Sequence, residues 1–258
     1  MSSCKDLYES VGNWAGVNKD VRELAFLCTK PRIVVSGRLA SGKDTVAELT
    51  MRTLGYPDAI GISYASPIRE EVNYLLDVVR HETKTEAVKI IAQYGNIDTN
   101  LSQHIADLLY AATQENSEIT SYTRTDEIRS TLQIWGTDVR RSKDYDYWAK
   151  KAIANVFGHM ALDRAIYITD ARFVNDIDAA RKIGFYAVRL HVDRDIRDQR
   201  LYARDGLHLN PDAENHPSEL NLENYPDFDI IVDNSGTLDE TIGAVIWQMS
   251  YTPAFSGN

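Results

Sequence analysis

The sequence predicts an α/β fold in which a parallel β-sheet is covered by helices on both faces. Short apolar segments alternate along the chain with helical patterns, and this alternation is typical of parallel sheets. The chain has 258 residues, of which 43% are apolar and 26% charged, so it can form a sizeable core. In such sheets ligands bind beyond the carboxyl ends of the strands, so residues that directly follow a strand are the first candidates for a site.

Five apolar segments, bounded by polar or turn-forming residues, are expected to be strands: residues 32–36, 60–65, 165–169, 185–192 and 228–232. Further segments show the helical pattern and are expected to be helices: residues 43–51, much of the stretch from Ser66 to about 160, 176–183 and 193–205. Ser66-Pro67 suits a helix start, because Ser can cap and Pro can take the first helical position. Thr237-Leu238-Asp239-Glu240 is a capping box that opens a last helix. We therefore expect one α/β domain at 31–258, with a helical insertion at about 66–160.

Residues 1–30 show a looser helical pattern, which Pro31 ends. They are expected to form a helical extension ahead of the domain. We hypothesise that this extension packs against a second copy of the chain in a homodimer.

Composition and charge argue against several classes of protein. Lys and Arg number 28 and Asp and Glu 38, which gives a net charge of −10 and disfavours binding to nucleic acid or to acidic membranes. Cys4 and Cys28 lie outside any CxxC or zinc-ligand spacing, which favours a reducing compartment. The chain also shows neither a signal-peptide pattern nor a run of about 18 apolar residues. A cytoplasmic location is expected, which would be the host cytoplasm if a phage encodes the chain.

The segment GRLASGKDT has the glycine and lysine spacing of a nucleotide-binding P-loop. Glycines allow backbone N–H groups to surround phosphate oxygens, the helix N-terminus adds partial positive charge, and the lysine reaches the β- and γ-phosphates. The expected ATP-binding residues of this loop are Gly37, Arg38, Ala40, Ser41, Gly42, Lys43, Asp44 and Thr45.

The loop departs from the usual pattern after Lys43, where Asp44 replaces the Ser or Thr that contacts Mg²⁺. Either Asp44 faces the metal, directly or through water, or it turns away and Thr45 supplies the hydroxyl. The sequence leaves both alternatives open. The candidate metal-binding residues are therefore Asp44, Thr45 and, at the end of a later strand, Asp170.

Four blocks of sequence together resemble phage-type deoxynucleoside monophosphate kinases. They are GRLASGKDT; SYASPIREE; RSTLQIWGTDVRR followed by DYDYW; and ITDARFVNDIDAARK followed by HPSE and VDNSGTLDE. The resemblance covers about residues 31–248 in the same order and excludes residues 1–30. It implies a P-loop kinase fold with a core sheet, a helical acceptor-binding region and a lid. It also implies transfer of a phosphoryl group from ATP, with Mg²⁺, to a deoxynucleoside 5′-monophosphate.

The chemistry of such a transfer can be compared with the residues available. The acceptor is a phosphate oxygen that is already ionised at pH 7, so positioning and cations should suffice without a general base. The chain contains 18 Arg, and none of its six His lies in a catalytic spacing such as HExxH. Asp170 and Arg172 follow the strand expected at 165–169. Asp170 is expected to hold a magnesium-bound water, and Arg172 to bind the transferring or the acceptor phosphate.

The resemblance places the deoxynucleotide mainly on the helical insertion. The expected acceptor-binding residues are Arg69, Arg129, Gln133, Asp138, Arg140, Arg172 and Asn175. Among them, Arg129 and Gln133 lie four residues apart on one face of a predicted helix, and Gly136-Thr137-Asp138 is expected to end that helix. A salt-bridged surface helix and a polar turn are the plain structural alternative for these residues.

Arg197, Arg200 and Arg204 lie within about 60° of one another on a predicted helix. An arginine stripe before a long polar loop is typical of a lid that closes over phosphates, here at about 193–226. Arg200 and Arg204 are therefore expected to stabilise the transferring group. Residues 234–236 resemble the turn that contacts adenine, so Asn234 and Gly236 join the expected ATP site. No role is predicted for His216-Pro217-Ser218-Glu219.

Two other readings stay open. A dephospho-coenzyme A kinase, or another small-molecule P-loop kinase, would share the loop and the arginine-bearing lid. From a different class, a P-loop ATPase module would act on a partner protein. The GTD block and the aromatic run from Tyr145 to Trp148 favour a deoxynucleotide by resemblance.

Overall fold

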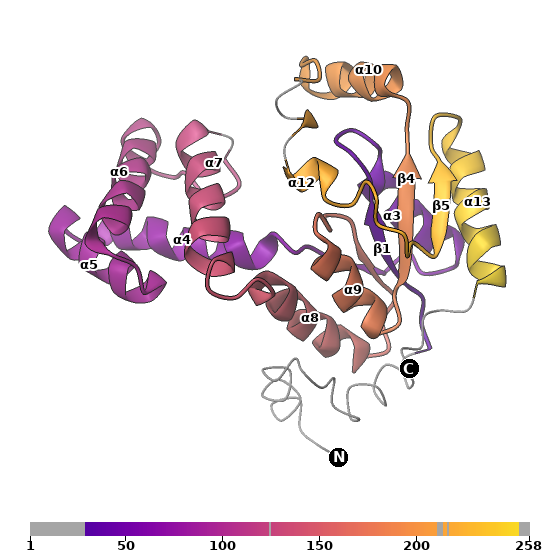
Figure 1. The fold of residues 1–258 in the computed structure, drawn as a ribbon, viewed down its shortest axis with the longest axis horizontal. Coiled ribbons are helices and arrows are strands. Elements are labelled where there is room, and N and C mark those ends of the chain that lie inside the picture. The colour runs from indigo at the N-terminus through magenta and orange to yellow at the C-terminus, as the bar shows by residue number, and fades with distance from the viewer. Residues whose placement is uncertain (1–28, 124, 211–213, 216, 253–258) are drawn as a thin grey trace. The chain divides into compact units, whose positions relative to one another are not determined.

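The computed structural model describes residues 29–123, 125–210, 214–215 and 217–252 (Figure 1). The expected extension at 1–30 lies almost wholly outside the described residues, and so do Cys4, Cys28 and His216. The chain divides into two compact units. We call Met1–Tyr64 with Ala152–Asn258 the sheet unit and Ala65–Lys151 the helical unit. No helix in the described ranges is both long enough and apolar enough to cross a membrane.

Five parallel strands form the sheet of the sheet unit, in the order β2-β3-β1-β4-β5. They are β1 (Arg32–Ser36), β2 (Ile60–Ile62), β3 (Ile166–Ile168), β4 (Tyr186–His191) and β5 (Ile230–Asp233). In the register, Val34 of central β1 lies opposite Ile168 of β3 and Ala187 of β4. The expected α/β class with a parallel sheet is confirmed, and each strand overlaps the segment expected for it.

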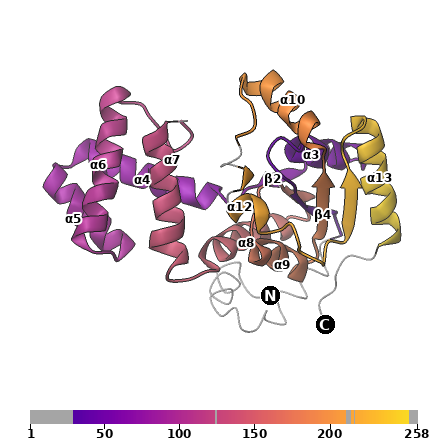
Figure 2. The same ribbon diagram turned by 45° about the horizontal axis from the view of Figure 1, so that its top comes forward.

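Helices cover both faces of this sheet (Figures 1 and 2). The helices of the sheet unit are α3 (Lys43–Thr53), α9 (Val174–Lys182), α10 (Arg194–Asp205), α12 (Pro217–Leu220), α13 (Leu238–Tyr251) and the part of α8 (Tyr147–Met160) from Ala152 onward. On one face α3 and α13 bury Val46, Met51 and Val245 against Val35 and Val188 of the sheet. On the opposite face lie α8 and α9. This arrangement leaves the carboxyl ends of the strands to the loops.

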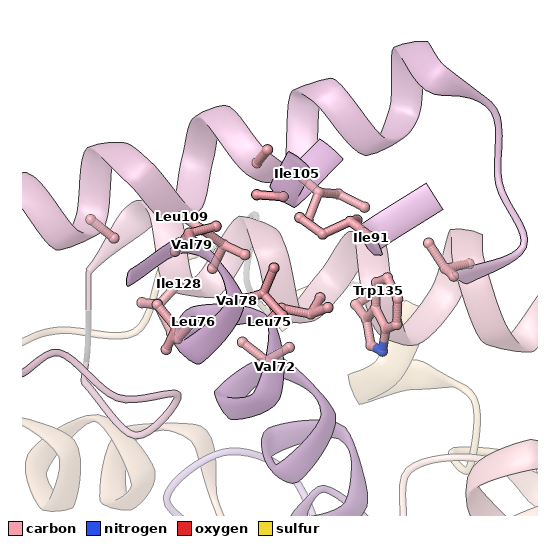
Figure 3. Close-up of a cluster of buried hydrophobic side chains, with 14 of the residues drawn as sticks. Val72, Leu75, Leu76, Val78, Val79, Ile91, Ile105, Leu109, Ile128 and Trp135 are labelled. Carbon is pink, nitrogen blue, oxygen red and sulfur yellow. The ribbon is translucent and has the colours of Figure 1, made fainter. Parts of the chain in front are cut away.

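The helical unit has a core of its own (Figure 3). Its helices are α4 (Ser66–His81), α5 (Lys84–Gly95), α6 (Thr99–Glu115), α7 (Asp126–Gln133), the π-helix η1 (Ile134–Arg141) and the first residues of α8. Leu75, Ile91, Ile105, Leu109 and Trp135 are fully buried between these helices. The unit ends at Lys151 rather than near residue 160, because α8 from Ala152 onward groups with the sheet unit.

Two local expectations are wrong. Ser66 is the first residue of α4 rather than its cap, and Ala65 at the N-cap position makes no side-chain hydrogen bond. Gly136-Thr137-Asp138 does not end the helix that contains Arg129, because the chain continues directly into η1. The reason is packing: Trp135, Gly136 and Val139 are all buried, and the Gly136 carbonyl accepts a hydrogen bond from the buried Trp148 Nε1 at 2.9 Å.

Two helix boundaries have clear chemical causes. The Thr237 hydroxyl accepts a hydrogen bond from the Glu240 N–H, while the Glu240 carboxylate accepts one from the Thr237 N–H, so the expected capping box is confirmed. At the start of α9, the buried Asp176 carboxylate accepts hydrogen bonds from the N–H groups of Arg172 and Phe173, both at 3.1 Å. Asp176 therefore holds the backbone of Arg172 in place.

Candidate active site

The loop between β1 and α3 has the geometry of a phosphate-binding loop. Ala40 and Gly42 adopt left-handed conformations with φ of 62° and 80°, and such residues let successive N–H groups form an anion-binding concavity. A Cβ on Gly37 would lie 2.5 Å from the Ser41 Oγ and 3.0 Å from the Leu190 carbonyl oxygen. Close packing therefore requires a glycine at position 37, and the left-handed backbone conformation favours a glycine at position 42.

Lys43 begins α3 and curls back over the loop. Its Nζ donates hydrogen bonds to the carbonyl oxygens of Gly37 at 2.8 Å and Arg38 at 3.1 Å. Burial and, second to it, the nearby positive charge of Arg172 lower the pKa of Lys43 to about 8, against the opposing effect of Glu219. The ammonium group thus lies where a negatively charged ligand would stabilise it.

Phosphate binding is expected to depend on the protonation of Lys43. Above pH 8 the ligand-free side chain is increasingly neutral, so an incoming phosphate must bind together with a proton. We expect the Kd of ATP to rise about tenfold between pH 7 and pH 9. Isothermal titration calorimetry across this range measures the effect. Lys43→Arg keeps its charge and should show a much flatter profile.

A Kd of ATP that does not change with pH in the unaltered protein would remove Lys43 from the phosphate site.

The stability of the ligand-free protein depends on the protonation of Lys43 with the opposite sign. The unfolded lysine keeps its proton up to about 10.5, whereas the folded one loses it near 8. The free energy of unfolding contributed by this group therefore increases between these two pH values, because in that range the unfolded state still binds the proton that the folded state has lost.

Two candidate metal ligands come together at the carboxyl end of β3. The exposed Asp44 accepts a hydrogen bond from the Thr169 hydroxyl, and Thr169 directly precedes Asp170. The Asp170 carboxylate accepts hydrogen bonds from the Tyr64 N–H at 2.8 Å and from the Ser63 hydroxyl. Thr45 is also exposed at the start of α3. Asp44 and Thr45 are both exposed, so both alternatives for the metal contact stay predictions.

Asp44 and Asp170 could bind Mg²⁺ only if a phosphate-bearing molecule supplied further oxygen ligands. The described ranges contain no cluster of three or more His, Cys, Asp or Glu that could hold a metal ion. Mg²⁺ is commonly bound by one or two carboxylates together with water and substrate phosphates. Asp44 and Asp170 supply two carboxylates, so a magnesium ion would bind here together with a phosphate-bearing ligand.

Arg172 lines a hollow together with Gly37 and Lys43 of the loop. Its Nη1 forms an ion pair with the Glu219 carboxylate. The second carboxylate oxygen of Glu219 accepts a hydrogen bond from the Leu39 N–H, within the loop, at 2.9 Å. Asn175 is half-buried in the first turn of α9, three residues further along. Glu219 is thus a residue of the site to which the sequence assigned no role.

Arg189 on β4 is a second residue that sequence reasoning missed. Its side chain is buried, and it donates hydrogen bonds to the Ser36 Oγ at 3.0 Å and to the Glu223 carboxylate at 3.3 Å. Arg38 pairs with the same Glu223 oxygen at 3.0 Å. Burial lowers the pKa of Arg189. The available signal was an arginine in the middle of an otherwise apolar strand.

Two hollows flank the loop within the sheet unit, and Arg189 lines both. One has a volume of about 180 Å³ and is also lined by Arg38, Ser41, Arg197 and Glu223. In it the buried Ser41 Oγ and Arg197 Nε have no hydrogen-bond partner among the described residues. The other hollow is lined in addition by Gly37, Lys43, Asp170, Arg172 and Glu219. The loop is therefore surrounded by cationic side chains.

Two of the three arginines in the expected stripe on α10 reach towards the loop. Arg197 is buried, donates to the Leu39 carbonyl oxygen at 3.4 Å and pairs with Glu214 at 2.8 Å. Arg200 donates to the Asn234 carbonyl oxygen at 2.8 Å. Arg204 instead pairs with its neighbour Asp205 at 2.7 Å.

Asn234 connects the turn after β5 to the loop. Its side chain is buried; Nδ2 donates to the Ser41 carbonyl oxygen and Oδ1 accepts from the Thr241 hydroxyl, both at 2.8 Å. A Cβ on Gly236 would lie 2.9 Å from the capping carboxylate of Glu240. The Asn234 side chain thus holds the loop, and the contact of this turn with adenine stays a prediction.

The other acceptor candidates belong to the helical unit. Arg129, Gln133 and Asp138 are exposed on α7 and η1, and Arg129 lies 3.7 Å from Asp126. Arg69 and Arg140 are engaged within their own unit: Arg69 donates to the Ser121 carbonyl oxygen, and Arg140 pairs with Glu71 at 2.8 Å. A phosphate would have to displace these contacts to bind either arginine.

No protein-family model and no curated protein matches the chain. Among solved structures, it is similar to a gluconokinase from Sinorhizobium meliloti 1021, with 18% identity, 86% of this chain and 92% of the other covered, and a TM-score of 0.42. It is also similar to TT1252 from Thermus thermophilus, with 16% identity, 86% and 97% covered, and a TM-score of 0.43. These similarities are distant, so the fold and the site described above rest on the sheet order and on the loop itself.

Proposed function

We propose that this protein is an ATP- and Mg²⁺-dependent kinase that converts deoxynucleoside 5′-monophosphates to diphosphates. The observation that carries the kinase proposal is the gathering of Lys43, Arg172 and the buried Arg189 around a P-loop at the carboxyl end of the central strand. Such a cluster is unusual in a chain of net charge −10, and it suits the joining of two phosphate groups that repel each other. The choice of a deoxynucleotide as acceptor is supported by the resemblance of the four sequence blocks.

In this proposal the loop N–H groups and Lys43 bind the β- and γ-phosphates of ATP. Magnesium, held by the Asp44 and Asp170 carboxylates, would neutralise phosphate charge when bound. Arg172 and Arg200 would neutralise the group in transfer, since Arg172 lines the same hollow as Lys43 and Arg200 donates a hydrogen bond to the turn after β5. Arg204 would have to leave Asp205 to join them. No side chain is needed as a base, because the attacking oxygen carries no proton at neutral pH.

The helical unit would bind the acceptor. Arg129 is 78% exposed in its side chain, and Gln133 lies one turn further on the same helix. These side chains offer a cation for the acceptor phosphate and an amide for the base or sugar. The exposed Asp138 adds a hydrogen-bond acceptor.

Replacing Arg129 by alanine is expected to raise the apparent KM of the acceptor about tenfold, because a charge-assisted hydrogen bond to phosphate is lost. The KM of ATP should change less than about twofold. Steady-state kinetics with each substrate varied in turn measures both constants. Lys89→Ala is the matched control, since it removes an exposed positive charge from α5 of the same unit. An effect confined to ATP would take Arg129 out of the acceptor site.

The proposed function is tested by measuring ATP consumption in a coupled assay over all deoxynucleoside and ribonucleoside monophosphates. Consumption that depends on a deoxynucleoside monophosphate is the expected result, with the diphosphate identified as product. Consumption without any acceptor would indicate an ATPase, and consumption only with dephospho-coenzyme A or another small molecule would indicate a different kinase. Either of these results would overturn the proposed acceptor.

A further inference from the structure

A carboxylate of the protein itself lies in the hollow beside Lys43. Glu219 accepts a hydrogen bond from the Leu39 N–H at 2.9 Å and forms an ion pair with Arg172. Its side chain is only 11% exposed. A loop N–H and a guanidinium group are also what a phosphate oxygen requires. Glu219 therefore makes the contacts that a bound phosphate would be expected to make.

A second carboxylate, that of Glu223, also pairs with arginines, in the other hollow beside the loop. One oxygen of Glu223 is shared by Arg38, at 3.0 Å, and by the buried Arg189, at 3.3 Å. Between the two glutamates, Leu222 is buried and anchors the segment. Residues 219–223 thus bring two negative charges to three arginines around one loop. We call this stretch the acidic segment.

From these contacts we infer that the acidic segment is an internal competitor for phosphate: Glu219 and Glu223 occupy two phosphate positions in the ligand-free protein and leave them when a polyphosphate binds. The inference rests on the proposed function only in taking the P-loop as a phosphate site. Both carboxylates stabilise Arg38, Arg172 and Arg189 while no ligand is present. Each would repel a phosphate placed in the same hollow. Binding therefore requires the carboxylates to be displaced, and removing their charge should strengthen binding.

The test measures the Kd of inorganic tripolyphosphate by calorimetry at constant ionic strength, because charge interactions here depend on salt. Tripolyphosphate carries the phosphates of ATP without its base or sugar. Glu219→Gln is expected to lower the Kd about tenfold, and the more exposed Glu223→Gln about threefold. The matched control is Asp227→Asn, which removes one negative charge from an exposed residue shortly after the acidic segment. This control should change the Kd less than about twofold.

An unchanged or a higher Kd in Glu219→Gln would overturn the inference, since the carboxylate would then be neutral for phosphate binding or would support it. Thermal unfolding of each variant shows whether it is folded. A second measurement needs no variant: hydrogen–deuterium exchange of the unaltered protein. When tripolyphosphate is added, peptides that cover residues 217–226 should exchange faster and peptides that cover residues 37–45 more slowly. Slower or unchanged exchange in the acidic segment would also contradict the inference.

The outcomes separate this inference from the proposed function. Tighter binding in the variants without any nucleotide-dependent turnover would support the internal competitor and reject the kinase. Turnover with a deoxynucleotide, together with an unchanged Kd of tripolyphosphate in Glu219→Gln, would support the kinase and reject the internal competitor. If none of the four proteins binds tripolyphosphate, the P-loop is not a phosphate site and both proposals fail.

Discussion

Lys43→Ala is expected to lower kcat/KM for ATP-dependent phosphoryl transfer about 10²- to 10³-fold while the protein stays folded. In the proposed function, the Lys43 ammonium group would neutralise charge that develops on the transferred phosphate. Alanine removes the ammonium group and leaves the backbone of the loop unchanged. Steady-state kinetics gives the rate, and circular dichroism with thermal unfolding reports on the fold.

The fold should survive because, within the described part of the chain, the hydrogen bonds of the Lys43 ammonium group go to the loop carbonyl oxygens of Gly37 and Arg38. Burial lowers the pKa of its ammonium group, which means that the charged form is disfavoured in the folded protein. Arg52→Ala is the matched control: it removes a positive charge from the same helix, where Arg52 makes an exposed ion pair with Glu48. A folded Lys43→Ala variant with normal turnover would refute the role of Lys43.

The largest expected effect on stability comes from Glu71→Ala in the helical unit. The Glu71 side chain is 4% exposed and accepts hydrogen bonds from four side chains. The donors are Trp135 Nε1 at 2.8 Å, Arg140 Nε at 2.8 Å, Tyr147 Oη at 2.7 Å and Lys151 Nζ at 2.7 Å. Removal of the carboxylate leaves two cations and two polar groups without their acceptor.

We expect Glu71→Ala to lower the free energy of unfolding of the helical unit by about 3 kcal/mol, since breaking a buried charge network leaves uncompensated charge. Lys151 is 40% exposed, so water can solvate part of the released charge. Urea unfolding followed by tryptophan fluorescence measures the change. Glu70→Ala, one residue earlier and exposed, should cost less than about 0.5 kcal/mol. Equal effects of the two substitutions would show that the network does not stabilise the unit.

The pH dependence of this network has a definite sign. Burial alone would raise the pKa of Glu71, but hydrogen bonds from Lys151, Tyr147 and Trp135 outweigh that effect and hold the pKa below its usual value of 4.5. The stabilising contribution of Glu71 is therefore present at neutral pH. It is lost as the pH falls through the lowered pKa.

Arg140 shows how a sequence-based role can compete with a structural one. The resemblance places Arg140 among the acceptor ligands, and that role stays a prediction. Its guanidinium group lies over the rings of Tyr94 and Trp135, both at 4.8 Å, and pairs with Glu71. Glu71 is 69 positions away in the chain, so no local pattern indicated that the two would meet. Arg129, which keeps an exposed side chain, is the better subject for a first test.

Regular local patterns were sufficient for the class of the fold and for the position of the loop. The spacing of Gly37, Gly42 and Lys43 indicated the loop because steric limits and phosphate chemistry act on neighbouring residues. Apolar runs located all five strands because each of them carries its signal within a few residues. The π-helix after Gln133 was missed, because the packing of Trp135 and Val139 in the core overrides the turn tendency of Gly136-Thr137-Asp138.

By itself, the sequence determined the parallel α/β architecture, the P-loop after the first strand and the chemical types of residue around it. Only the tertiary structure decided which charges meet: Arg38 with Glu223, 185 positions apart, Arg172 with Glu219, and the buried Arg189 with Ser36. The physical reason is the separation along the chain of the residues that interact. Strand and loop signals depend on neighbours along the chain, whereas ion pairs and pKa values depend on distances through space, which exist only once the chain has folded.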